Sequence, residues 1–582
     1  MSEASSIPSN KPKSVSTFTV ILDGNKMSEQ FRVLSIVVYK EINRITRSTV
    51  LLQDGSAAEQ TFTASNSEEL IPGKSIEITA GYQNDEEQIF KGIIVKHSIQ
   101  VRKNVSVLVV ECRHEAIKMT TKLRNNYFHE MSDSDIADQL CRDHGLTLNS
   151  DSSNITHQEL VQFNCTDWDF MLCRAEENGF WVTTESGTEI SMKAPDFNQD
   201  PVLSLAYGAT IKELDAEIDS RTQYQALKSI GWNPAEQEPV TSDAQDPSVP
   251  AVGNISASDL SMVTGNQELE IRHPGLGQAE LSVWANSMLQ KHRLAKIRGK
   301  LKIDGIHTPL PGQLCELQNV GARFEGKVMI SGVRHQIEKG NWETFIQFGE
   351  SPLRFAERFE LEQPLASALL PAVSGLHIGI VTGLEDPNGE ERIQVRLPLV
   401  HDSDDGAWMR LCALDAGENR GWVFRPEIGD EVIVGFINSD PRHGIILGKL
   451  HSSKNTAPFA GASNDNHQKG FLSREELKLL FDDEKKAISW ETPGGHKVVI
   501  DDDSTSITLE DSNGNKIVMD ANGIEIKSAK DLILSASVDM KMDSGANTEI
   551  SGGAMAKLEG SAGAELSSGG STAVKGSMVQ IN

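Results

Sequence analysis

A repeat of eight residues occupies the last part of the chain, and it constrains the fold more than any other sequence feature. A Ser, Ala or Gly follows two positions after each apolar residue of the repeat. Two positions before it, the side chains shrink along the chain, from Ile524 and Leu532 to Ala564 and Thr572. A period of eight fits neither an α-helix nor a coiled coil, so it predicts short strands joined by tight turns. The repeating apolar residues are Ile526, Leu534, Met542, Ile550, Leu558, Leu566 and Val574.

One chain cannot bury this apolar column, because one or two apolar residues in every eight are too few to close a core. Repeat units bury their apolar faces only against neighbours, so several chains must wrap together. We expect three chains around one axis, forming a triangular prism with the column as its core. The alternative, a disordered tail rich in Gly, Ser and Ala, gives no reason for the columns to stay in register.

Composition excludes several classes of protein. The 582 residues include 83 acidic and 55 basic side chains, a formal net charge of −28. Nucleic-acid binding needs clustered Lys and Arg side chains, so this acidic chain is not expected to bind nucleic acid. No stretch approaches the ~20 apolar residues of a membrane helix, and residues 1–14 lack the apolar segment of a signal peptide. The six cysteines stand singly, which is typical of reduced, buried or half-buried thiols in a protein made in the cytoplasm.

The rest of the chain has the pattern of a mainly β protein with a few helices. Period-two alternation begins near Ser16, and helices are expected after the capping residues Ser132 and Thr166 and over 279–298. Residues 232–259 carry four prolines and are predicted to form a long exposed loop. Residues 478–486 are interpreted as a strand.

These patterns divide the chain into six predicted parts. They are a disordered N-terminus at 1–15, a β-rich region with short helices at 16–363, a linker at 364–374, a compact all-β module at 375–455, a connector at 456–489, and a C-terminal segment at 490–582 that contains the repeat.

Several independent motifs, in the expected order, resemble the VgrG family, the spike proteins of type VI secretion and related contractile injection machines. Residues 429–436 and 440–451 are similar to the oligonucleotide/oligosaccharide-binding (OB-fold) module of that family. Residues 310–312 and 332–335 look like its hub motifs, and 490–501 resembles the entry to its β-prism. The resemblance implies hub domains of β-barrel type with short helices, an OB-fold module, and a C-terminal trimeric β-helix, or β-prism, needle.

Family membership implies a homotrimer whose base sits on Hcp-like rings of the inner tube, among baseplate proteins. Contraction would drive it through a target membrane, together with effector proteins and a PAAR-like tip protein. Met578, Val579 and Ile581 break the repeat and leave apolar side chains exposed, so they are the predicted tip-binding residues. Assembly is expected in the bacterial cytoplasm, followed by secretion or injection. The hub and spike of a phage tail or of an extracellular injection particle is an alternative with the same physics.

Each segment that resembles an enzyme motif lacks a residue or a spacing that the motif requires, so no catalytic, cofactor-binding or metal-binding residue is predicted. Residues 321–328 nearly match a phosphate-binding loop, but Val328 replaces the hydroxyl residue that binds Mg²⁺, and we interpret them as a turn. Residues 501–503 and 511–514 fail the calcium-loop spacing and are interpreted as hairpin turns. A glycan hydrolase borne on the needle is disfavoured, because no segment of about 100 residues remains for its core. The last repeat ends close to Asn582, so any toxin is expected to be a separate protein.

Overall fold

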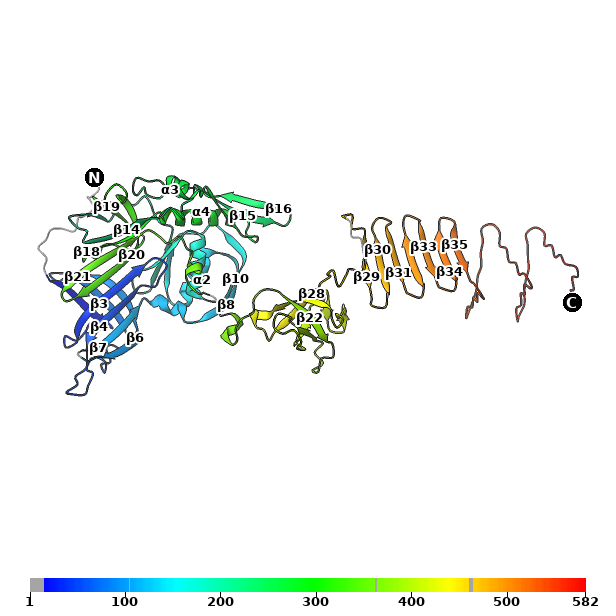
Figure 1. The fold of residues 1–582 in the computed structure, drawn as a ribbon, viewed down its shortest axis with the longest axis horizontal. Helices are drawn as coiled ribbons and strands as arrows, with labels where there is room; N and C mark the ends of the chain where they lie inside the picture. Colours follow the sequence, from blue (N-terminus) through cyan, green and yellow to red (C-terminus); the bar gives the residue numbers. More distant parts are fainter. Residues whose placement is uncertain (1–14, 104, 362–363, 460–463, 582) are drawn as a thin grey trace. The chain divides into compact units, whose positions relative to one another are not determined.

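The computed structural model describes residues 15–103, 105–361, 364–459 and 464–581, and it is mainly β with a few short helices (Figure 1). The predicted fold class is confirmed. The chain divides into two compact units that meet in sequence at Leu369 and Leu370. Each unit has its own core, so each is described by itself.

The first unit, the hub, is built on one sheet of 13 strands, in which β3 (Arg32–Glu41) pairs with β20 (Gly326–Glu338). This antiparallel pairing joins the beginning of the unit to its end. The order along the sheet is β14-β18-β21-β20-β3-β4-β7-β6-β5-β1-β2, with β19 pairing to β20 and β13 to β19. The other bounds are β1 Ser16–Leu22, β2 Asn25–Lys26, β4 Arg47–Gln53, β5 Ser75–Tyr82, β6 Asp85–Val101, β7 Ser106–Arg113, β13 Leu203–Ala206, β14 Glu213–Ile218, β18 Ile297–Asp304, β19 Leu314–Gln318 and β21 Asn341–Phe348.

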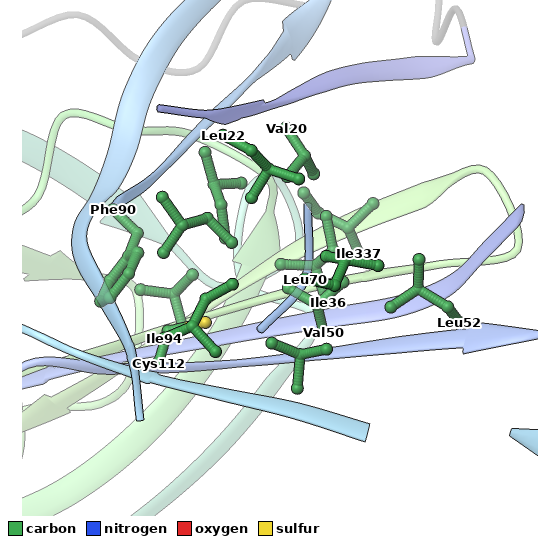
Figure 2. Close-up of a cluster of buried hydrophobic side chains, with 14 of the residues drawn as sticks. Val20, Leu22, Ile36, Val50, Leu52, Leu70, Phe90, Ile94, Cys112 and Ile337 are labelled. Atoms are coloured by element: carbon green, nitrogen blue, oxygen red, sulfur yellow. The ribbon is translucent and has the colours of Figure 1, made fainter. Parts of the chain in front are cut away.

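Alternating apolar side chains of this sheet form separate buried clusters. Figure 2 shows one of them, in which Ile36, Val50 and Phe90 from three strands converge with Ile337 from β20. Cys112 lies in the same cluster, and burial raises the pKa of its thiol to about 12, so this cysteine behaves as an apolar core residue. Five of the six cysteines are buried or half-buried as predicted, whereas Cys412 is exposed.

Two helices and a two-stranded ribbon form a second core in the hub. Helix α1 (Asp133–Asp143) begins with the predicted capping box, and α2 (Asp167–Glu177) begins at the predicted cap Thr166. They pack beside β8 (Leu123–Ser132) and β10 (Thr156–Thr166). The other elements of this region are η1 Glu115–Thr120, β9 Thr147–Ser150, β11 Trp181–Thr184 and β12 Glu189–Lys193.

The predicted loop at 232–259 is wrong in part. Strand β16 (Glu238–Asp243) pairs with β15 (Ala226–Asn233), and α3 (Ala257–Thr264) begins inside the same range. Pro239 sits in β16, which is the edge strand of its three-stranded sheet, where a missing N–H breaks no ladder. The elements that complete the hub are β17 Glu268–Arg272, α4 Gln278–Leu294, α5 Phe355–Arg358 and η2 Leu365–Ala368. The segment 321–328, which nearly matches a phosphate-binding loop, is a turn that leads into β20 at Gly326, as predicted.

The second unit begins with a closed five-stranded barrel around a small apolar core that includes Val381, Val432 and Ile446. Closure of five short strands is the architecture of an OB-fold. The barrel strands are β22 His377–Gly383, β23 Ile393–Arg396, β24 Ala407–Leu411, β27 Glu431–Phe436 and β28 Gly444–Lys449, accompanied by the short elements β25 Ala416–Gly417, β26 Arg420–Gly421 and η3 Ile437–Ser439.

A seven-stranded antiparallel sheet follows the barrel and begins at Gln468. It therefore starts inside the segment 456–489 predicted as a connector, and that part of the prediction is wrong. The interpretation of 478–486 as a strand is confirmed at Lys478–Asp482. Residues 528–581 contain no strand within this single chain, although the repeat predicts strands there. Strands need hydrogen-bonding partners, and a lone chain supplies none for this segment.

A buried carboxylate stabilises the helical part of the hub and allows a test. Asp133 is 3% exposed; its carboxylate accepts hydrogen bonds from Arg174 at 2.6 and 3.0 Å and from the Asn178 amide at 2.8 Å. Replacing it leaves a buried guanidinium without its main partner, so Asp133→Ala should lower the free energy of unfolding of the hub by about 3–5 kcal/mol. Calorimetric unfolding of the full chain measures this change. The control Asp138→Ala removes an exposed pair with Arg142 on the same helix and should cost less than about 1 kcal/mol.

The same carboxylate gives the effect a pH dependence. Burial is the largest single influence and raises the pKa of Asp133, but the hydrogen bonds and charge of Arg174, with smaller contributions from Asn178 and His157, together outweigh it. The pKa therefore falls below its ordinary value of 3.8. A carboxyl with a lowered pKa contributes its stability above the unfolded value and loses it as the pH falls through the folded value. The difference between wild type and Asp133→Ala should therefore be complete near pH 6 and shrink below about pH 4. A difference that stays constant down to pH 3 would contradict this role.

Candidate assembly interface of the needle

Seven strands of nearly equal length form the sheet of the second unit, and tight turns join them. Asp511 occupies one turn, where its carboxylate accepts hydrogen bonds from the side-chain amide and the backbone N–H of Asn515 and from the backbone N–H of Asn513. These hydrogen bonds hold its pKa at about 2. Asp501 accepts from the backbone N–H groups of Asp503 and Ser504 in another. Both acidic segments are hairpin turns, as predicted. The strands are β29 Gln468–Leu472, β30 Lys478–Asp482, β31 Ala487–Glu491, β32 Lys497–Asp501, β33 Ser506–Glu510, β34 Lys516–Asp520 and β35 Gly523–Lys527 (Figure 1).

The strand register places large apolar side chains on one side of the sheet, in two columns that we call the apolar face. Successive side chains of a strand point to opposite faces, so residues paired across strands share a face. Trp490 pairs with Leu479 and Val498, and the same relation continues from strand to strand. The first column contains Phe471, Leu479, Trp490, Val498, Leu509, Ile517 and Ile526, and the second contains Phe481, Ile488, Ile500, Ile507, Met519 and Ile524.

Within the described part of the chain, the apolar face is left largely exposed. Trp490 is 58% exposed and Ile524 is 72% exposed, although both belong to well-formed strands. The first column also borders an open groove of about 850 Å³ that reaches Leu532. Burying one large apolar side chain contributes ~1.5–3 kcal/mol, so an uncovered face of this size strongly favours association.

Charged side chains occupy one row of the opposite side of the sheet. Lys478 lies 3.1 Å from Glu491, and Glu510 lies 3.5 Å from Lys497 and 3.6 Å from Lys516, measured between ammonium nitrogen and carboxylate oxygen. Such exposed ion pairs contribute little stability, but their charged groups make this row of side chains favourable to expose to water. This row makes the opposite side of the sheet more polar than the apolar face, although Leu480, Val499 and Val518 also lie on that side.

The structure places the predicted needle-core residues in two settings. Ile526 lies in β35, pairs with Ile517 and ends the first column of the apolar face. Ile524 ends the second column in the same way, so the columns of the repeat continue those of the sheet. The other six predicted core residues, Leu534, Met542, Ile550, Leu558, Leu566 and Val574, lie outside strands and are 63–81% exposed. The predicted tip residues Met578, Val579 and Ile581 are also exposed.

The eight-residue period does not reveal the earlier part of the apolar face, because a different period operates there. Each pair of strands with its two turns takes 19 residues, which separates Phe471 from Trp490 and Trp490 from Leu509. The same interval separates Phe481 from Ile500. A search of the sequence for this longer period would have found the face.

Two other properties bear on the kind of site. Within the described ranges, no group of three or more His, Cys, Asp and Glu side chains is placed to hold a metal ion. None of the described helices has the length and apolar character needed to cross a membrane.

Three family models match successive parts of the chain. The Alg8 N-terminal domain matches residues 12–339, more than half of the chain, which therefore belongs to that domain family over these residues. The type VI secretion system/phage-baseplate injector OB domain matches 377–451, the closed barrel. The phage baseplate V C-terminal trimerisation domain matches 487–556, which takes in β31 to β35 and the first four residues of the repeat column.

Curated relatives agree with these matches. The type VI secretion system spike proteins VgrG1c and VgrG1b of Pseudomonas aeruginosa are 26% and 25% identical over 401 and 399 residues, 60% of this chain. The chain belongs to the VgrG family of spike proteins. It spans about half the length of these two VgrG relatives, 50% and 49%. An actin cross-linking toxin of Vibrio cholerae matches at 35% identity over 100 residues, which is 15% of this chain and 9% of the toxin.

Solved structures of tail and secretion proteins resemble this VgrG chain at low identity. A 43 kDa prophage tail protein from Shewanella oneidensis has a TM-score of 0.44 at 12% identity, covering 58% of this chain and 98% of the tail protein. A component of the Escherichia coli type VI secretion system has a TM-score of 0.37 at 12% identity, covering 74% of this chain and 99% of that component.

One pair of neighbouring substitutions tests which side of the sheet faces a partner. Ile507 lies on the apolar face and Thr508 on the opposite side, in the middle of the same strand. A carboxylate at 507 would be buried in an apolar contact, so Ile507→Asp should abolish self-association, whereas Thr508→Asp should preserve it. Light scattering of the purified variants measures the mass. Equal masses for the two variants would show that the apolar face is not the interface.

Proposed function

We propose that this protein is the structural spike of a contractile injection machine and acts as a homotrimer. The supporting observation is the apolar face, which one chain leaves exposed over all seven strands and which coincides with the trimerisation-domain match from residue 487 onward. Three copies would turn their apolar faces to a common axis and their charged rows outward. The exposed columns of the repeat, from Leu534 to Val574, would form the further length of the same core.

The mechanism of such a spike is passive. The chain performs no catalysis; contraction of a surrounding sheath supplies the work, and the narrow trimeric prism transmits the force to a small area. The base of the trimer would sit on Hcp-like rings of the inner tube, among baseplate proteins, and the spike would carry effectors as separate proteins. The protein would assemble in the bacterial cytoplasm and leave it by contraction. The two Pseudomonas relatives are type VI spikes, which supports this setting over a phage tail.

The oligomeric state and the repeat column are tested together. Light scattering should give the wild type about three times 63.6 kDa. In a trimer, three copies of Leu558→Asp would bring like charges together in an apolar core. We expect this variant to lose protease resistance over 520–582 while the calorimetric transition of the hub stays unchanged, since domains with separate cores melt separately.

Lys557→Asp serves as the matched control, because it introduces the same carboxylate one position away from the column. It should keep the wild-type protease pattern. A monodisperse wild-type monomer at micromolar concentration would contradict the trimer, and full resistance of Leu558→Asp would show that the column is not the core.

The predicted tip site is tested by truncation. Met578 and Ile581 are 84% and 90% exposed, and apolar side chains of this kind suit a partner that covers the end of a prism. Removing residues 577–582 should abolish capture of a PAAR-like protein in a pull-down while the mass of three chains is retained. Undiminished capture by the truncated trimer would place the cap elsewhere.

A further inference from the structure

The hub contains a cavity of about 680 Å³ that the spike function does not use. It lies among β3, β14, β18, β20, α4 and α5, within the first unit. Its wall includes the apolar side chains of Ile42, Phe348, Leu353, Phe355 and Phe359. Charged side chains of both signs complete the wall, so their pairing decides what the cavity can bind.

The carboxylates of the wall are already paired. Lys291 is 5% exposed, and its ammonium lies 2.7 Å from the carboxylate of Glu176 and also contacts Glu350. The Trp181 indole N–H donates to Glu350, and the backbone N–H of Phe355 donates to Glu176. The remaining acidic groups pair as Glu217 with Arg298 at 2.7 Å, Asp215 with Lys300 at 3.3 Å, and Glu41 with Arg47 at 3.8 Å.

Two arginines of the wall lack such a partner. Among the described residues, neither Arg44 nor Arg358 has a carboxylate within 4.0 Å of its guanidinium, in a chain with 28 more acidic than basic side chains. Both contact the ring of Phe359, with the guanidinium carbons 5.0 and 5.4 Å from the ring centre. These contacts hold two cationic groups beside the cavity, no more than about 10 Å apart.

The geometry points to a binding site in the hub for an acidic, extended segment of another protein, with Arg44 and Arg358 as the residues that bind its carboxylates. Carboxylates two positions apart on an extended chain start from backbone positions ~6.6 Å apart and can reach both guanidiniums. A third side chain on the same face would contact the apolar wall at Leu353 and Phe355. A small inorganic anion would leave that wall uncovered, so a peptide fits the whole site better.

All residues of the site lie in the hub, and none belongs to the apolar face of the needle on which the proposed trimer rests. The proposed peptide site can therefore be tested separately from the proposed spike function. A variant that loses this site should keep the mass of the wild-type assembly.

A fluorescein-labelled peptide, Glu-Thr-Glu-Thr-Leu with blocked ends, tests the site by fluorescence anisotropy on the full chain. The wild type should bind it at least about tenfold more tightly than the Gln-Thr-Gln-Thr-Leu peptide, since a charge-assisted hydrogen bond contributes about a factor of ten or more. Arg44→Ala and Arg358→Ala should each reduce affinity about tenfold, and binding should weaken with salt. Arg358→Lys should restore part of the affinity.

Arg323→Ala is the control, because this exposed hub arginine donates a hydrogen bond to Asn254 and lies outside the cavity. The affinity of this variant for the peptide should equal that of the wild type. Calorimetry verifies that each variant folds; Arg358 is exposed, so its replacement tests the site even if Arg44→Ala unfolds. Equal affinity for both peptides, no binding of either, or wild-type affinity in Arg358→Ala would overturn the proposal. Displacement of the peptide by millimolar inorganic phosphate would also overturn it, and would indicate a site for small anions.

Discussion

A sheet with one largely apolar face, which no described segment of its own chain covers, is the constraint on which the needle part of the second unit depends. Seven short strands satisfy their backbone hydrogen bonds along the sheet, and yet Trp490, Ile524 and their column neighbours remain in water. Within a globular domain a helix or a second sheet would cover such a face. Here the chain continues instead into a repeat whose apolar residues lie in the same columns. The sheet and the repeat therefore form only a partial core, which is the basis for the proposed association with other copies.

The hub, in contrast, buries its apolar side chains within a single chain. In its 13-stranded sheet, the pairing of β3 with β20 joins the beginning of the hub sequence to its end, and the apolar side chains form clusters that the hub itself closes. Buried charges there are matched: Asp133 with Arg174, and Lys291 with two glutamates. Because a buried charge without a partner is costly, such pairs hold elements of distant sequence in place. Arg44 and Arg358, which have no carboxylate partner among the described residues and contact Phe359, stand out against this background.

Local signals predicted local structure well. The capping residues Ser132 and Thr166 begin helices as expected, because a cap depends on three or four neighbouring residues. The prolines at 232–259 led to the wrong prediction of a continuous loop. Whether Pro239 interrupts a strand depends on whether that strand lies at the edge of its sheet, which the sequence does not show. The start of the sheet within 456–489 was missed for a similar reason. Apolar and polar residues alternate there in the sequence, but the sequence does not show which strands pair with them. Cys412 is exposed for a reason that no neighbour in the sequence indicates.

The sequence by itself determined the period of the repeat and the family of the chain, because both depend on spacing along one chain. The tertiary structure alone decided that the columns of the repeat extend those of a seven-stranded sheet. It also decided that Arg44 and Arg358, more than 300 residues apart, contact the same ring. Cross-strand register and charge pairing join residues that are distant in sequence, and one residue of slip in register would turn a side chain to the other face. Such properties exist only once the chain has folded.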